Sequence, residues 1–216
     1  YSDAYVLDPT TSTIEVEIPA TQHYRTGSYG LGDNLMAYVG DSDNFLYRST
    51  CGWIRLELTG AQRVESITLR GNNNEQLSGA ATLDYKSLAI ELTASATDAS
   101  SQSTTIDCGE GVQLSLTTPT EFYFVVAPQT FSKGFSVEVT FDDGSSITKS
   151  TAKSVTIERN HIQPMRASDT LFDYLDSSTL PLITTYPETI YDDTTGDIVI
   201  LVNAKGSAMA SYTGDM

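Results

Sequence analysis

Short segments in which apolar and polar residues alternate recur along most of this 216-residue chain. In Thr13–Ile18, Ile and Val alternate with Thr and Glu, and in Phe135–Phe141 every second residue is Phe or Val. A period of two places successive side chains on opposite faces of a strand, so each segment indicates a strand with one buried face. The turn residues Asp142–Gly144 follow the second segment and predict a hairpin. The pattern therefore predicts an antiparallel all-β protein of the sandwich type.

The same reasoning predicts strands along most of the rest of the chain, separated by turns rich in Gly, Asn and Asp. Phe122–Val126 is apolar throughout, which is typical of a central strand covered on both faces. The other expected strands are Leu35–Val39, Phe45–Tyr47, Cys51–Leu58, Val64–Leu69, Leu77–Leu83, Leu88–Leu92, Val112–Leu116, Ser146–Ser150, Val155–Ile157 and Ile198–Val202. Loops are expected at Ala20–Asn34 and Thr93–Thr105. At most one short helix is expected, capped by Ser168 and running to Leu175.

The chain is strongly acidic, with 28 Asp and Glu residues against 12 Lys and Arg and a net charge of −16. Such a field repels phosphate backbones, so nucleic acid is not expected as a partner. No segment approaches the roughly 20 apolar residues of a membrane-spanning helix, so no direct membrane span is expected. Because Tyr1 is not followed by the basic and apolar regions of an export signal, we expect any signal or lipid anchor to lie outside this chain.

Sequence motifs for catalysis or metal binding are not found. The chain has no GxSxG motif, and we expect its only histidines, His23 and His161, to lie at the surface or at strand ends. The segments Asp41–Asn44 and Asp192–Asp197 resemble calcium loops but lack the full EF-hand spacing, and ordinary Asp-rich turns would look the same. Paired carboxylates could hydrolyse glycosides, but any acidic sequence offers such pairs. We expect no metal, no cofactor and no enzymatic activity.

Two cysteines, Cys51 and Cys108, are too far apart for a CxxC redox or zinc motif. They could form a disulfide in an oxidising compartment. Alternatively, both could be small buried hydrophobic residues. The sequence leaves these alternatives open.

Aromatic residues give the best indication of a binding surface. The candidate residues are Tyr24, Tyr29, Tyr38, Tyr47 and Trp53, with Trp53 on the strand face opposite Ile54 and Leu56. Exposed aromatic rings stack on sugars or anchor protein interfaces. The alternative is that the same rings pack between the two sheets.

The middle of the chain resembles the fimbrillin-like surface proteins of Bacteroidales. The segments that carry the resemblance are Cys51–Gly60, Val64–Leu69, Leu77–Gly79, Ala127–Phe131 and Ile157–Met165. The resemblance extends over about 13–165. It implies a Greek-key, transthyretin-like β-sandwich, export to the cell surface as an outer-membrane lipoprotein, and a role in fimbriae or adhesion. It carries over no catalytic residues.

This resemblance suggests a domain organisation. Residues 51–165 are expected to form the fimbrillin-like sandwich, and residues 1–50 the end of a preceding β domain or additional N-terminal strands. Residues 166–216 would be a C-terminal extension or the start of a further β domain.

Fimbrial subunits assemble by donating a strand to a sheet of the neighbouring subunit. A short apolar strand near the C-terminus is the candidate donor in this chain. Its residues are Ile198, Val199, Ile200, Leu201 and Val202. The alternative, which we favour, is that this strand completes a sheet of its own chain, because an unpaired apolar strand promotes aggregation.

The leading hypothesis is a non-enzymatic adhesin or fimbrial structural protein at the cell surface. Its partners would be other fimbrial subunits, host or bacterial surface proteins, or glycans. The alternative is a carbohydrate-binding accessory module of a surface glycan-utilisation system, indicated by the tyrosines and Trp53. A hydrolase that uses two acidic residues ranks third.

Overall fold

The computed structural model describes residues 12–37, 47–84, 86–92, 99–165, 168–169, 198–200 and 210–212. The chain divides into two units, 1–171 and 172–216. Almost every element in the described residues is a strand; the exception is one 3-10 turn, η1 (Ala99–Gln102). The all-β prediction is therefore confirmed.

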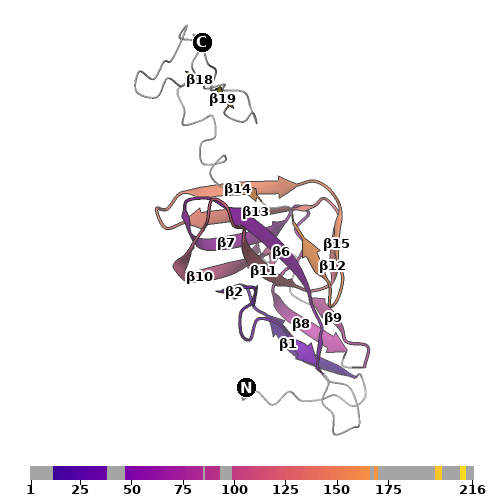
Figure 1. Cartoon of the computed structure of the whole chain (residues 1–216). Coiled ribbons are helices and arrows are strands. Elements are labelled where there is room, and N and C mark those ends of the chain that lie inside the picture. Colours follow the sequence, from indigo (N-terminus) through magenta and orange to yellow (C-terminus); the bar gives the residue numbers. More distant parts are fainter. Residues whose placement is uncertain are drawn as a thin grey trace. The chain divides into compact units, whose positions relative to one another are not determined.

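Three sheets build the first unit (Figure 1). The largest has the order β14 (Ser146–Thr151), β13 (Phe135–Phe141), β7 (Arg63–Gly71), β10 (Ser103–Gln113), β2 (Thr21–Arg25) and β3 (Ser28–Tyr29). The second has the order β11 (Thr120–Val126), β6 (Gly52–Thr59) and β16 (Ile162–Pro164), and β17 (Ser168–Asp169) also pairs with β6. The third contains β1 (Thr13–Ile18), β8 (Gly79–Asp84) and β9 (Ala89–Leu92), and lies at the end of the unit away from β14.

Short strand pairs complete the topology. They are β4 (Met36–Ala37) with β5 (Arg48–Ser49), β12 (Gln129–Phe131) with β15 (Val155–Ile157), and, in the second unit, β18 (Ile198–Ile200) with β19 (Ala210–Tyr212). Most neighbouring strands are antiparallel, as expected. However, β2 runs parallel to β10, and β16 and β17 run parallel to β6.

The main core lies between the six-stranded sheet and the inner face of β6 and β11. Alternate residues of β6, including Ile54, Leu56 and Leu58, face it, as do Phe122 and Phe124 of β11. Residues of β7, β10, β13 and β14 cover them from the opposite sheet. Burial of these two apolar faces against each other is the main stabilising contribution to a sandwich of this kind.

A second, smaller core lies on the other face of β11. Val125 packs there with Cys51 and with Val16, Ile18 and Leu83 from β1 and β8. Phe124 and Val125, neighbours in sequence, are thus buried in different cores. Phe122–Val126 is therefore a strand with both faces covered at Val125, but it lies at the edge of its sheet rather than at the predicted central position.

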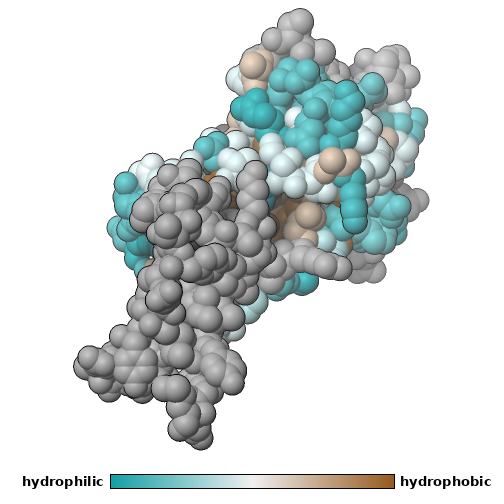
Figure 2. All heavy atoms as spheres, turned by 90° about the horizontal axis from the view of Figure 1, so that it is seen from above, coloured by the Kyte–Doolittle hydropathy of each residue, from teal (hydrophilic) through white to brown (hydrophobic). Residues whose placement is uncertain are grey.

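Several strand predictions match the structure closely. Thr13–Ile18, Phe135–Phe141 and Val155–Ile157 have the expected bounds, and the hairpin through Asp142–Gly144 is formed. The buried side chains of the described residues leave a mostly hydrophilic surface on the face shown in Figure 2. In these three strands the alternating pattern therefore indicates correctly which face is buried.

Other predictions were wrong. The expected loop Ala20–Asn34 contains β2 and β3, and the strand predicted at Val112–Leu116 begins at Ser103, within the other expected loop. Leu116 is 62% exposed rather than buried. The strands in the two expected loops were missed because their buried positions include the polar residues Gln22 and Thr104, whereas the alternating pattern identifies a strand by buried apolar residues.

Two further predictions near strand ends are corrected. Tyr47, the last residue of an expected strand, lies just before β5, and the two residues before it lie outside the described ones. The expected helix from Ser168 is replaced by β17, because Ser168 and Asp169 pair with the end of β6. Asp169, which would be the first helical residue after the Ser168 cap, is extended instead, and the rest of that helix lies outside the described residues.

The candidate donor strand has a partner in its own chain. Ile198, Val199 and Ile200 form β18, which pairs with the antiparallel strand β19. Val199, at the centre of β18, lies opposite Ser211. In this structure the segment therefore pairs within its own chain, and its donation to another subunit stays a prediction. Leu201 and Val202 lie outside the described residues.

The first fifty residues contribute strands to the same unit as the later ones. β1 pairs with β8 along its whole length, and β2 pairs with β10. These strands lie in the unit 1–171, and the domain boundaries suggested by the family resemblance stay predictions. The Greek-key connection pattern implied by the family resemblance stays a prediction.

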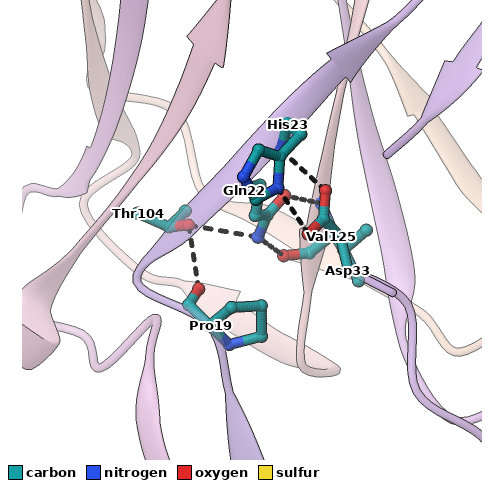
Figure 3. Close-up of polar contacts among 6 residues, drawn as sticks. All are labelled: Pro19, Gln22, His23, Asp33, Thr104 and Val125. Carbon is teal, nitrogen blue, oxygen red and sulfur yellow. Dashed lines mark hydrogen bonds and ion pairs between the residues drawn. The ribbon is translucent and has the colours of Figure 1, made fainter. Parts of the chain in front are cut away.

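The side chain of Gln22 fastens β2 to the free edge of β11 (Figure 3). Its amide oxygen accepts a hydrogen bond from the backbone N–H of Val125 at 2.8 Å, and its amide nitrogen donates to the Val125 carbonyl at 2.8 Å. The second amide proton goes to the Thr104 hydroxyl at 3.1 Å. Gln22 is only 1% exposed, so this amide replaces a missing strand neighbour at a buried position.

Both cysteines are free and buried, and they belong to different cores. In the structure Cys51 and Cys108 are therefore two separate buried thiols and do not form a disulfide. Burial raises the pKa of Cys51 from 9.0 to about 11. Burial and the nearby charge of Asp107 raise the pKa of Cys108 to about 12. Both thiols are therefore protonated and weakly reactive at neutral pH.

These raised pKa values predict a loss of stability in alkali. Above pH 9 the unfolded chain releases thiol protons that the folded chain retains, so the free energy of unfolding should fall as pH rises toward 11 to 12. Below pH 9 the thiols should have no effect. Urea unfolding between pH 8 and pH 11 measures this, with the double variant Cys51→Ala/Cys108→Ala as the control. Equal pH slopes for the two proteins would contradict the prediction.

Candidate functional site: an aromatic recess

A recess of about 380 Å³ lies where β3, the β4–β5 pair and the start of β6 meet. It is lined by Tyr29, Asn34, Met36, Tyr47, Arg48, Ser49, Trp53, Arg159 and Asn160. The volume falls within the range of about 300–1,000 Å³ that is usual for small-molecule sites. Aromatic, amide, hydroxyl and guanidinium groups thus come together from segments far apart in the sequence.

The aromatic wall is preformed. The rings of Tyr29 and Trp53 are stacked, with centroids 5.7 Å apart and an angle of 2° between their planes. The indole N–H of Trp53 has no hydrogen-bond partner in the described part of the chain, so packing holds that ring. Tyr47 is 58% exposed, and Met36 is also exposed. Aromatic rings that are partly open to solvent provide flat apolar area with little loss of side-chain entropy on binding.

Polar contacts fix the two segments behind this wall. Asn34 donates to the Tyr29 hydroxyl at 3.2 Å. The Ser49 hydroxyl lies 2.9 Å from both the Asn34 side-chain oxygen and the Cys51 carbonyl. The backbone N–H of Thr50 donates to the Leu35 carbonyl at 3.0 Å. The loop before β4 and the end of β5 are therefore held together beside the start of β6.

A turn near the end of the sandwich supplies the last wall. The backbone N–H of Trp53 donates to the His161 carbonyl at 2.9 Å, and the backbone N–H of Asn160 donates to the Cys51 carbonyl, also at 2.9 Å. A Cβ on Gly52 would collide with the Glu158 carbonyl, so only glycine allows this approach. Arg159 is thereby brought to the recess, where its guanidinium donates to the Ser49 carbonyl at 3.2 Å.

Three of the five predicted binding residues, Tyr29, Tyr47 and Trp53, meet at this recess. Tyr24 does not, because its ring packs on Phe122 of the main core with centroids 5.1 Å apart. Tyr38 lies outside the described residues. As predicted, Trp53 faces away from the core that holds Ile54 and Leu56.

Sequence reasoning missed the polar part of the recess. Asn34, Arg48 and Arg159 line it although no local motif marks them. The one sequence signal that could have pointed to these arginines was their charge, because basic residues are uncommon in a chain with more than twice as many acidic as basic residues.

The histidines lie away from this recess or point to solvent. His23 on β2 is 63% exposed, with its Nδ1 3.3 Å from the carboxylate of the buried Asp33, which also accepts the His23 backbone N–H at 2.7 Å. His161 lies beside Glu158 with both side chains exposed. No group of three or more potential metal ligands occurs within the described ranges. The calcium-like segments 41–44 and 192–197 lie outside them.

A membrane-crossing helix is not found in the part of the chain that the structure describes.

No protein family model and no curated protein matches the sequence of this chain. Among solved structures, it is similar to a proposed cell adhesion protein from Bacteroides ovatus, with a TM-score of 0.41 and 11% sequence identity. The alignment covers 74% of this chain and 63% of the other protein, so the chain spans less than two thirds of that length.

Proposed function

We propose that this protein is a non-enzymatic, adhesin-type binding protein of the cell surface, and that it holds a sugar in the aromatic recess. The observation that supports this most directly is the meeting of Tyr29, Tyr47 and Trp53 at one preformed recess. Sugar rings present an apolar face that stacks on aromatic rings. The amides of Asn34 and Asn160 offer hydrogen bonds to sugar hydroxyls.

The resemblance of the segment 51–165 to fimbrillin-like proteins supports the surface and adhesion parts of this proposal. A purely fimbrial role, in which subunits polymerise by strand donation, is the less favoured version. The strand of Ile198, Val199 and Ile200 already has a partner in its own chain. A fimbrial role also gives the recess no purpose.

The proposal that the protein is not an enzyme is supported by the state of its reactive groups. Burial keeps both thiols protonated at neutral pH, which makes them poor nucleophiles. The carboxylate of Asp33 is used to fasten the backbone and ring of His23. Hydrolysis of a defined glycan by the pure protein, at a rate far above the buffer blank, would overturn this part of the proposal.

A glycan array provides the test of binding. We expect the wild-type protein to retain a restricted set of glycans, and Tyr47→Ala to lose about two- to twelvefold in affinity, because stacking on one aromatic ring contributes roughly 0.5–1.5 kcal/mol. Tyr47 is largely exposed, so this substitution should leave thermal stability nearly unchanged.

Tyr24→Phe is the matched control. It alters a tyrosine that packs against the main core rather than lining the recess, so binding should persist. If the wild-type protein and Tyr47→Ala bound the same glycans equally well, the recess would not be the binding site.

A further inference from the structure

We infer that the recess selects an acidic sugar, a pyranose that carries a carboxylate, such as a uronic or sialic acid. This inference rests on the proposed function and specifies its ligand. The observation behind it is the pair of arginines, Arg48 and Arg159, among the lining residues.

The charge of the recess opposes the charge of the molecule. The chain has 28 acidic and 12 basic residues, yet the described residues that line the recess include two arginines and no Asp or Glu. No ion pair joins either guanidinium to a carboxylate within the described ranges. A local positive region on a strongly negative surface favours an anionic ligand over a neutral one.

The two guanidinium groups are placed differently. Arg159 is half-buried, and its hydrogen bond to the Ser49 carbonyl holds it at the recess wall. Arg48 is exposed on β5, one residue from Ser49, so its guanidinium can move to meet a ligand. Planar guanidinium groups bind carboxylates through two parallel hydrogen bonds, which are stronger than bonds between neutral groups. A carboxylate at this point could therefore be held by a fixed and an adjustable donor.

The remaining lining residues favour a sugar over a simple anion. The stacked rings of Tyr29 and Trp53 and the exposed ring of Tyr47 add apolar area that a small inorganic anion would leave unused. The amides of Asn34 and Asn160 match hydroxyl groups. A ring with one apolar face, several hydroxyls and one carboxylate uses each of these features.

Fluorescence gives a direct measurement, because Trp53 is the only tryptophan in the chain. The probes are methyl β-glucuronide and the methyl glycoside of N-acetylneuraminic acid, with methyl β-glucoside as the neutral match for the first. We expect at least one acidic probe to change Trp53 emission with at least about tenfold higher affinity than the glucoside. That preference should shrink when NaCl is raised from about 50 mM to about 500 mM.

Arg48→Gln tests the assigned residue. It removes one positive charge from an exposed side chain, so folding should be preserved, and the preference for the acidic sugar should fall about tenfold. Arg70→Gln makes the same change at an exposed position of β7 that does not line the recess, and should leave the preference unchanged.

The outcomes separate this inference from the proposed function. If the glucoside binds as tightly as the acidic probes, or Arg48→Gln keeps the full preference, the inference is wrong while a sugar-binding recess remains supported. If none of the probes and no glycan on the array binds, the proposed function fails as well.

Discussion

Replacing Gln22 by Met should lower the free energy of unfolding by roughly 2–4 kcal/mol. Methionine has nearly the shape of glutamine but cannot form hydrogen bonds with the backbone N–H and carbonyl of Val125, each 2.8 Å from the Gln22 amide. Both backbone groups are buried at the free edge of β11, where water cannot easily replace the amide. The cost therefore comes from two unsatisfied groups rather than from a cavity. Urea unfolding followed by circular dichroism measures it.

Two variants control this prediction. Thr21→Ala changes the exposed neighbour on the same strand and should stay within about 0.5 kcal/mol of wild type. Gln22→Glu keeps an acceptor for the Val125 N–H but places a carboxylate against its carbonyl, so it should also destabilise the fold. An unfolding free energy for Gln22→Met equal to that of Thr21→Ala would show that this amide does not secure the edge.

Gln22 also explains where sequence reasoning stopped. The buried face of Phe135–Phe141 can be recognised from its local sequence, because every second residue is apolar. This strand was predicted with the correct bounds. The buried residue of β2 is a glutamine, Gln22. Its hydrogen-bond partners, Thr104 and Val125, are 82 and 103 residues away in the sequence. No local pattern can indicate a polar residue whose burial depends on distant backbone groups.

The recess shows the same division. Its aromatic residues could be proposed from the sequence, because the tyrosines lie in segments rich in turn residues and Trp53 lies on the strand face opposite Ile54 and Leu56. Its arginines could not. Arg159 reaches the recess only because the turn before β16 is bonded to the start of β6, and its partner Ser49 is 110 residues away. Sequence reasoning therefore indicated the stacking surface, and the fold supplied the groups that give it a charge preference.

The opposite faces of β11 allow the two cores to be tested separately. Phe124 is 0% exposed in the main core, while Val125, also 0% exposed, lies in the smaller one. Tyr123, the residue before them, offers a mild comparison, because Tyr123→Phe removes only the hydrogen bond from its hydroxyl to Glu121. Its expected cost is below about 1 kcal/mol.

Phe124→Ala should lower the free energy of unfolding by about 3–5 kcal/mol, since it removes a whole ring from a closely packed core and the surrounding strands can collapse only in part. Val125→Ala removes less apolar volume and should cost about 2 kcal/mol. Equilibrium unfolding in urea measures both. If Val125→Ala cost no more than Tyr123→Phe, the sheet of β1, β8 and β9 would not be packed on β11. A large cost at both positions would show that this strand links the two cores.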